Sequence, residues 1–226
     1  MARPGDPIVG LDIGTTKVCV LIAERSATRP MDVIGVGTAP SRGMRKGVVV
    51  NLDACVGSIK QAIEEAELMA GCSVDRAFVG VAGAHVRGLN SRGVVAISGR
   101  DHEVTREDVQ RVLAAARAVN IPPDRDIVHV LPQEFKVDDQ EGIHDPAGMT
   151  GAKLEADVHI VTASVTAAQN LVNSVNRAGV EVEEVVLEQL AAADAVLTPD
   201  EKEMGVALID IGAGTSDLVI FERAAI

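Results

Sequence analysis

The chain has almost no aromatic residues. Its 226 residues include three phenylalanines and neither tryptophan nor tyrosine, although 47% of them are hydrophobic. A core can therefore form, but Val, Ile, Leu and Ala must fill it. This composition favours a Val/Ile-rich sheet covered by Ala/Leu-rich helices, which is the α/β class.

The sequence also lacks the usual signals of metal sites and disulfides. The three cysteines, Cys19, Cys55 and Cys72, show no Cys-x-x-Cys spacing, and the five histidines are scattered. An odd number of thiols in apolar segments indicates reduced cysteines in a cytosolic protein.

Positive charge is scarce, since 21 Lys and Arg stand against 33 Asp and Glu, for a net charge of −12. Nucleic-acid binding needs clustered basic residues, so nucleic acid is excluded as a partner. Any bound anion must be held locally, by backbone amides and a lysine or two. No apolar run approaches the roughly 20 residues of a membrane span, and the N-terminus has no signal core, so we expect a soluble chain.

Apolar periodicity and turn residues predict alternating strands and helices. Strands are expected at 8–13, 18–23, 31–38, 76–83, 86–98 (as one or two), 126–138, 154–163 and 181–188. Helices are expected from Asn51 or Asp53 to Gly71, from Thr105 to Pro122, over 165–178 before Gly179, and over 190–197. Segments 39–53, 139–153 and 198–205 are expected to be loops.

Two segments repeat one pattern: "GLDIGTTKVCVLI" at 10–22 and "LIDIGAGTSDLVIF" at 208–221. Each joins apolar residues to Asp-Ile-Gly, a Gly/Thr/Ser turn and a second apolar run. Glycine lets backbone amides approach a phosphate chain, hydroxyls add hydrogen bonds, and a strand-end Asp can hold hydrated Mg²⁺. One such turn fits an ordinary hairpin equally well, but two suggest a duplicated fold with a phosphate clamp on each lobe.

The pair of segments resembles the phosphate-1 and phosphate-2 motifs of the actin/Hsp70/sugar-kinase superfamily. Within it, "SRGMRKGVVVNLD" (41–53) and "LPQEFKVDDQEGIHDPAGMTGAKLEADVHIVTA" (131–163) resemble the bacterial cell-division FtsA family. The resemblance implies an actin-like, ribonuclease-H-like α/β fold. Subdomain 1A would comprise 1–83 and 164–195, an inserted α+β subdomain 1C (an SHS2 domain) 84–163, and the start of lobe 2A 196–226.

The resemblance also implies site residues for Mg·ATP. Those at the first turn would be Asp12, Gly14, Thr15, Thr16 and Lys17, and those at the second Asp210, Gly212, Ala213, Gly214 and Thr215. Asp12 and Asp210 would position Mg²⁺ through water, and Lys17 would supply compensating charge. Glu188 stands where relatives orient the attacking water, but Gln189 follows it in place of the usual proline, so a solvated strand-end glutamate is an equal alternative.

Relatives of this family polymerise, dock onto the tubulin-like FtsZ and other division proteins, and tether them to the membrane through a C-terminal amphipathic helix. The resemblance thus places the full-length protein at the cytoplasmic face of the inner membrane at the division site. The adenosine contacts, the FtsZ-docking region and the membrane helix are expected beyond Ile226, so this chain should bind ATP weakly or not at all and should not bind membranes. Activity is expected to be at most a weak ATPase.

Two alternatives remain open. A sugar-kinase-type phosphotransferase would need a carboxylate base and a sugar platform, and the loop from Asp138 to Lys153 offers carboxylates without apolar residues for such a platform. An actin-like pilus-assembly scaffold would share the fold and the kind of insertion, but not the 41–53 and 131–163 stretches.

Overall fold

The computed structural model describes residues 7–25, 31–98 and 101–226. Two compact units share the chain. The first comprises Met1–Val86, Ser164–Ala195 and Ile209–Leu218, and the second comprises Arg87–Ala163, Val196–Leu208 and Val219–Ile226.

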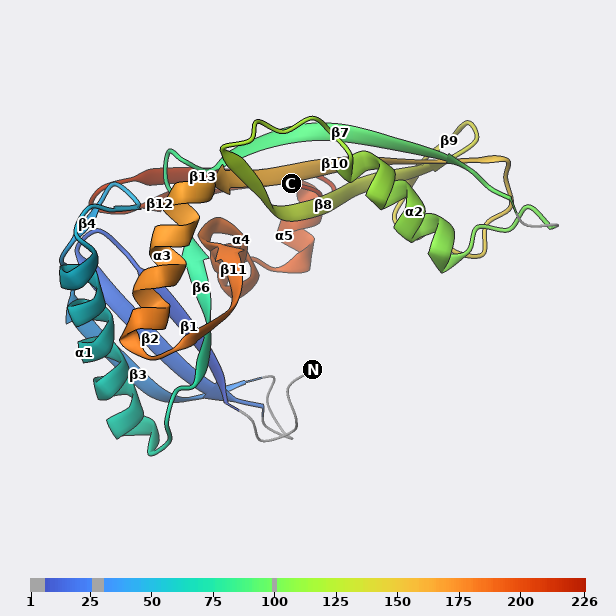
Figure 1. Cartoon of the computed structure of the whole chain (residues 1–226). Coiled ribbons are helices and arrows are strands. Elements are labelled where there is room, and N and C mark those ends of the chain that lie inside the picture. Colours follow the sequence, from blue (N-terminus) through green and yellow to red (C-terminus); the bar gives the residue numbers. More distant parts are fainter. Residues whose placement is uncertain (1–6, 26–30, 99–100) are drawn as a thin grey trace. The chain divides into compact units, whose positions relative to one another are not determined.

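The first unit is built on a five-stranded sheet in the order β11-β6-β1-β2-β3 (Figure 1). Its strands are β1 (Ile8–Ile13), β2 (Lys17–Glu24), β3 (Asp32–Pro40), β6 (Arg76–Val81) and β11 (Glu181–Leu187). β1, β2 and β3 form an antiparallel meander, while β6 and β11 run parallel to β1. The N-terminal meander and two crossovers thus make one mixed sheet.

Two helices pack on one face of this sheet, α1 (Leu52–Ala70) and α3 (Val165–Ala178). The Oδ1 of Asn51 accepts the N–H of Ala54 at the start of α1, and Gly71 ends it in the left-handed conformation at φ 70°. Gly179 ends α3 in the same conformation, at φ 104°. The predicted ends of both helices are thus confirmed. The helices end at these residues because only glycine adopts the left-handed backbone at little cost. A third helix, α4 (Glu188–Val196), follows β11 directly.

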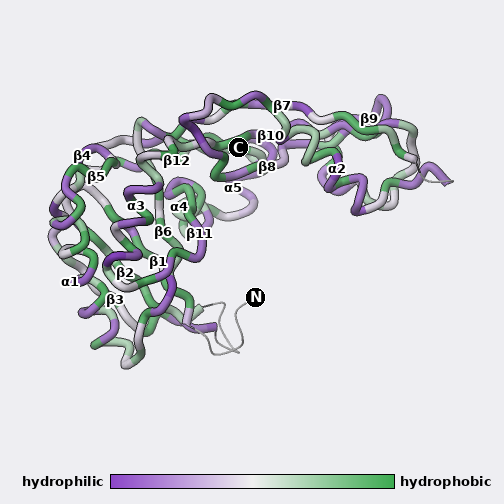
Figure 2. The backbone as a smooth tube through the Cα atoms, viewed as in Figure 1, coloured by the Kyte–Doolittle hydropathy of each residue, from purple (hydrophilic) through white to green (hydrophobic). Residues whose placement is uncertain are grey.

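The core of the first unit lies between α1, α3 and the sheet. Along β1, Val9, Leu11 and Ile13 are buried, while the residues between them face the other way. Polar and apolar residues also alternate along α1 (Figure 2). This pattern buries one stripe of the helix against one face of the strands.

The outer edge of the sheet, β3, is covered by side chains of α1. A Cβ on Gly35 would lie 2.7 Å from the carbonyl oxygen of Ala66, so α1 approaches β3 closely only because glycine is there. From that position Glu65 accepts the N–H of Thr38 at 2.6 Å, and Met69 Sδ accepts that of Val36 at 3.4 Å. These contacts occupy backbone donors that an edge strand otherwise exposes.

The second unit centres on a four-stranded sheet in the order β7-β10-β8-β9. Its strands are β7 (Arg87–Ala96), β8 (Arg125–Val137), β9 (Gln140–Ile143) and β10 (Lys153–Ser164). Helix α2 (Arg106–Arg117) packs on β7, and Thr105 and Asp108 form a capping box at its start. The predicted cap at Thr105 is confirmed, and Leu154, Val158 and Ile160 lie in the core under the sheet.

The opposite face of this sheet carries paired charges. Arg92 on β7 makes two hydrogen bonds to Asp157 on β10, at 2.6 and 2.9 Å. Lys136 on β8 lies 2.8 Å from Glu141 on β9. Charges that neutralise one another keep this face polar without a single-sign field.

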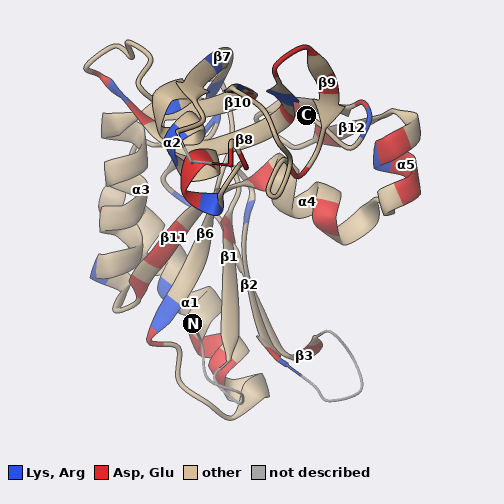
Figure 3. Ribbon diagram, turned by 90° about the vertical axis from the view of Figure 1, so that its right-hand side faces the viewer, with Lys and Arg blue, Asp and Glu red and all other residues tan. Residues whose placement is uncertain are grey.

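The chain ends in short elements: α5 (Pro199–Met204), and the two-stranded sheet of β12 (Val206–Ile211) and β13 (Ser216–Phe221). Acidic and basic residues both mark α5 (Figure 3). A second two-stranded ribbon, β4 (Met44–Arg45) and β5 (Val48–Val49), lies between β3 and α1.

All three predicted loops contain regular elements, so these expectations were wrong. Segment 39–53 holds the β4–β5 ribbon, whose Lys46-Gly47 turn has φ of 50° and 77°. Positive φ at both central residues makes a tight hairpin possible there. Segment 139–153 begins with β9, which pairs with β8, and segment 198–205 holds α5.

Two smaller differences concern the second unit. Of the two expectations for residues 86–98, a single strand is correct, because β7 (Arg87–Ala96) pairs with β10 without interruption through Ser91 and Arg92. Helix α2 ends at Arg117, ahead of Pro122, because Ala118 already leaves the helical conformation.

Among the helices of the described residues, none has the length and apolar character needed to cross a membrane.

Candidate functional site

The two Asp-Ile-Gly segments form hairpins closed by the same hydrogen bond. In the first, between β1 and β2, the N–H of Gly14 donates to the carbonyl oxygen of Lys17 at 2.9 Å. In the second, between β12 and β13, the N–H of Gly212 donates to the carbonyl oxygen of Thr215 at 2.9 Å. The two turns therefore share one backbone design, as the repeated sequence predicts.

The tips of the two hairpins meet within the first unit. A Cβ on Gly214 would collide with the Oγ1 of Thr15. A Cβ on Gly14 would lie 3.0 Å from the Lys17 carbonyl oxygen. Glycine at position 214 leaves space for the two turns to face each other closely, while glycine at position 14 leaves space for its own turn to close.

Four carboxylates gather beside these turns: Asp12 on β1, Glu188 at the start of α4, Asp210 on β12 and Asp217 on β13. Glu188 lies over Gly80 on β6, where an added Cβ would be 2.9 Å from Oε1. The missing side chain of Gly80 thus makes room for the Glu188 carboxyl. Lys17 is the cation close enough to Asp12 to affect its titration.

The crowding of carboxylates changes their protonation. Burial, together with the negative charges of Asp12, Asp210 and Asp217, raises the pKa of Glu188 to about 8, and burial is the largest of these causes. Burial also raises the pKa of Asp12; nearby Lys17 lowers it in part, and Asp210 raises it again. A cation placed here would relieve this repulsion, so the site favours a positively charged ligand or metal ion.

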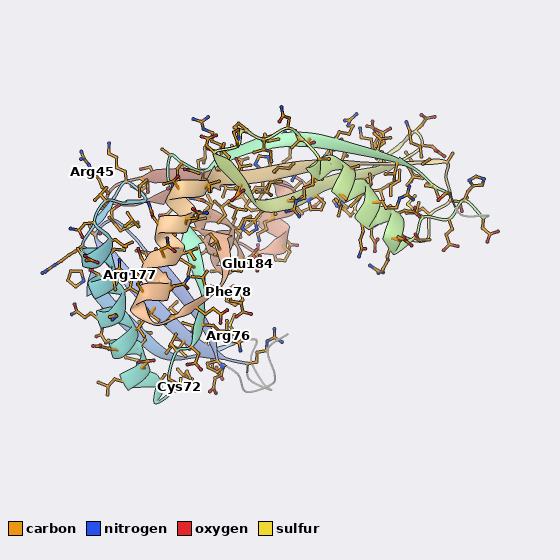
Figure 4. All side chains as sticks on the ribbon, in the orientation of Figure 1. Arg45, Cys72, Arg76, Phe78, Arg177 and Glu184 are labelled. Carbon is orange, nitrogen blue, oxygen red and sulfur yellow. The ribbon has the colours of Figure 1, made fainter. Side chains whose placement is uncertain are left out.

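Two cavities adjoin the carboxylates. One, of about 40 Å³, has room for a few water molecules. Glu188, Gly14, Thr15 and Thr215 line it, together with Met44 and Gly47 of the β4–β5 ribbon. The second, of about 380 Å³, follows the free face of the sheet and is mainly apolar. Its lining includes Leu21, Phe78, Val186, Asp12 and Glu188. Figure 4 shows Phe78 and Glu184 along this side of the strands.

The structure brings most of the sequence-predicted residues together. Asp12, Lys17, Glu188 and Asp210 line the larger cavity. Thr15 and Thr215 line the smaller one, and Gly214 lies against Thr15.

The remaining predicted residues form backbone hydrogen bonds within the protein or are exposed. The N–H groups of Gly14 and Gly212 are donated inside their own turns, so these glycines close the two hairpins. Thr16 accepts the N–H of Ser41 through its carbonyl oxygen, and its side chain and Ala213 are exposed. Glu188 begins α4 and is half-buried, with its carboxyl over Gly80.

Sequence reasoning missed four residues of the site: Asp217, Gly80, Met44 and Gly47. Asp217 follows the second turn by two residues, and alternation along a strand was an available signal for it. Gly80 comes from a segment with no motif, and the ribbon lies in the family-like stretch 41–53, whose pattern did not point to the phosphate turns.

Within residues 7–25, 31–98 and 101–226, no group of three or more His, Cys, Asp or Glu side chains is arranged to bind a metal directly. An ion with few protein ligands suits Mg²⁺, which retains most of its water.

Comparison with known proteins shows the family of this chain. Residues 83–162 match the family model described as the SHS2 domain inserted in FTSA. Over 224 residues, 99% of this chain, the sequence is 55% identical to the cell division protein FtsA of Pseudomonas aeruginosa. This sequence belongs to the FtsA family. It is also 41% identical to the FtsA of Escherichia coli over 97% of the chain.

The chain spans about half the length of the FtsA relatives it matches, 53% of the Pseudomonas protein and 52% of the Escherichia protein.

Solved structures show the fold. A chain of the PilM-PilN type IV pilus biogenesis complex matches with a TM-score of 0.66 at 17% identity, covering 98% of this chain and 60% of that one. The ethanolamine utilization protein EutJ of Carboxydothermus hydrogenoformans matches with a TM-score of 0.51 at 15% identity, over 99% and 50% of the two chains. The expected actin-like α/β fold with an inserted SHS2 domain is thus confirmed.

Proposed function

We propose that this FtsA-family chain is part of an actin-like cell-division protein that binds Mg·ATP between its two Asp-Ile-Gly hairpins. The observation that carries the proposal is the meeting of two hairpins with the same internal hydrogen bond, beside a cluster of carboxylates. Facing turns with glycine at the contact suit a phosphate chain held from both sides.

In this proposal, Thr15 and Thr215 provide hydroxyls to phosphate oxygens. Thr16 and Ala213 provide exposed turn backbone, and the half-buried Gly214 provides backbone beside Thr15. Lys17 adds the positive charge that a triphosphate needs. Asp12 and Asp210 hold water molecules of the metal, which when bound supplies charge that neutralises phosphate oxygens.

Glu188 explains why activity would be weak. A carboxyl with a pKa near 8 is mostly protonated at neutral pH in the ligand-free chain. A protonated carboxyl cannot accept a proton from water, so Glu188 would act as a base only once a bound metal ion has lowered its pKa. We therefore expect at most slow ATP hydrolysis, as suits a protein regulated by nucleotide.

The wider role follows from the family. We propose that the full-length protein polymerises, binds FtsZ and other division proteins, and links the FtsZ ring to the inner membrane at the division site through a C-terminal helix. Relatives at 41–55% identity are named cell division proteins, which supports this role. The pilus-assembly alternative has support from fold similarity alone, at 17% identity.

The domain arrangement is part of the same proposal. Residues 1–83 and 164–195 would form subdomain 1A, residues 84–163 subdomain 1C, and residues 196–226 the start of 2A. The FtsA-specific SHS2 match at 83–162 supports the middle boundaries.

The test is Mg·ATP binding by the full-length protein, measured by titration calorimetry. Asp210→Ala should weaken binding at least tenfold, because it removes one of two aspartates proposed to hold the hydrated metal. Lys17→Ala should weaken binding by about 1–3 kcal/mol, the size of a lost charged hydrogen bond. Asp139→Ala, at an exposed aspartate of the second unit, is the matched control and should change nothing.

Folded fraction is checked for each variant by urea unfolding. Unchanged affinity in both the Asp210 and the Lys17 variants would exclude the clamp as the nucleotide site.

A further inference from the structure

The β4–β5 ribbon is fastened at its base to two parts of the first unit. The N–H of Ser41 donates to the carbonyl oxygen of Thr16 at 2.9 Å, which joins the ribbon to the first hairpin. The N–H groups of Val50 and Asn51 donate to the carbonyl oxygen of Gly43 at 2.8 and 3.1 Å. Because Asn51 also caps α1, the ribbon connects the first phosphate turn with the start of that helix.

The tip of the ribbon touches the end of β6. A Cβ on Gly47 would lie 2.5 Å from the carbonyl oxygen of Ala82, nearer than any real Cβ contact. A Cβ on Gly83 would lie 3.2 Å from the carbonyl oxygen of Lys46 and 3.3 Å from Thr215 Cγ2. Ribbon, Gly83 and the second phosphate turn are thus packed in series, with glycine at both contacts.

The ribbon also closes the smaller cavity. Met44 and Gly47 line it opposite Thr15, Thr215 and Glu188. Arg45, by contrast, extends outward from the ribbon (Figure 4) and is exposed. The wall toward the carboxylates therefore consists of the Met44 side chain and the Gly47 backbone, and the basic side chain of Arg45 lies outside it.

We propose that the β4–β5 ribbon is a third wall of the phosphate site, and that the Lys46-Gly47 turn is a positioning element that sets Gly83 against Thr215. This inference rests on the proposed nucleotide function of the same site. It follows that phosphate held between the hairpins steadies the ribbon, and that a displaced ribbon loosens the second turn. Occupancy of the site thus reaches the exposed basic tip and the start of α1.

The experiment compares two glycines with nearly the same positive φ. Gly47 has φ 77° and Gly142, in the second unit, has φ 73°, so alanine strains both alike. Only at Gly47 does the new Cβ meet another atom, since nothing lies within 4 Å at Gly142. In the full-length protein, Gly47→Ala should lower Mg·ATP affinity at least tenfold, and Gly142→Ala should leave it within twofold.

A second readout follows the ribbon directly. Mg·ATP should slow amide hydrogen exchange in residues 41–51 of the wild type, and this protection should be lost in Gly47→Ala. Met44→Ala provides a variant without backbone strain if Gly47→Ala does not fold, and should weaken binding severalfold. Met31→Ala, at an exposed methionine, is its control.

The outcomes separate this inference from the function on which it rests. Wild-type protein that does not bind Mg·ATP overturns both. Wild-type binding that Gly47→Ala and Met44→Ala leave unchanged, with no protection of residues 41–51, overturns the ribbon's role alone.

Discussion

The two Asp-Ile-Gly hairpins share a turn but differ in their surroundings. In β1, Ile13 is 4% exposed beneath α1 and α3, whereas Ile211, at the same place in β12, is 78% exposed. The first hairpin is part of a five-stranded sheet, and the second is a sheet of two strands. Turn geometry is therefore set locally by Gly and its neighbours, while the stability of each hairpin depends on what covers it.

The largest expected effect tests that dependence at the two isoleucines. Ile13→Ala should lower the free energy of unfolding of this chain by about 2–5 kcal/mol, because it empties a buried site. Ile211→Ala should change it by less than about 0.5 kcal/mol, as at an exposed position. Urea unfolding followed by circular dichroism measures both, and equal losses would show that the second hairpin is buried in solution.

Some parts of the fold and of the site could be predicted from the sequence, and others could not. The hairpins, the caps at Asn51, Thr105, Gly71 and Gly179, and the fold class follow from local patterns and from the family resemblance. Gly80 could not be placed, because it joins the site only through the pairing of β6 with β1 and β11, whereas Asp217 follows the second turn closely and alternation along its strand was an available signal. The capping box of Thr198 and Glu201 was present in the sequence, but the short, highly charged helix it begins has no apolar stripe.

The ribbon was missed for a related reason. Its strands are two residues long, too short for any alternating pattern, and its turn is recognisable only by positive φ at Lys46 and Gly47. Its importance lies in the contact of Gly47 with Ala82, which no local sequence rule encodes.

A second prediction asks which hairpin acts more strongly on Glu188. Glu188 has a pKa of about 8 in the folded chain and the ordinary pKa of 4.5 in the unfolded chain. Between these two pH values, the folded chain holds a proton at Glu188 that the unfolded chain has already released. Stability should therefore fall as pH rises through this window. Glu188→Gln should remove that slope and raise stability at pH 9 by about 2 kcal/mol relative to wild type, as a partly solvated carboxyl allows.

Asp12 of the first hairpin and Asp210 of the second affect Glu188 to different degrees. Asp12 raises the pKa of Glu188 more than Asp210 does. Asp12→Asn should thus flatten the pH dependence more than Asp210→Asn, in unfolding titrations from pH 5 to pH 9. The reverse order would mean that the second hairpin approaches Glu188 more closely than the first.

The smallest expected effect concerns the contact between the turns. Thr16 of the first turn and Gly214 of the second occupy equivalent positions. Glycine is required at position 214 because this position faces Thr15 of the other hairpin. Gly214→Ala should push the second hairpin away and speed amide exchange in residues 216–221 about fivefold, or about 1 kcal/mol. Gly10→Ala, where nothing lies within 4 Å, is the control and should leave that exchange as it is in the wild type.

The closed edge at β3 also sets the direction in which the sheet can be assembled during synthesis. Strands β1 to β3 and helix α1 come from the continuous segment 8–70, so they can form while later residues are still being translated. Glu65 and Met69 occupy two outer donors of β3, the N–H groups of Thr38 and Val36, and this makes the edge less open to a further strand. From β1 the sheet can grow on its other side, first with β6 and then with β11, which is synthesised after residues 87–163. We therefore expect α1 to reduce pairing of the unfinished sheet with neighbouring chains during synthesis.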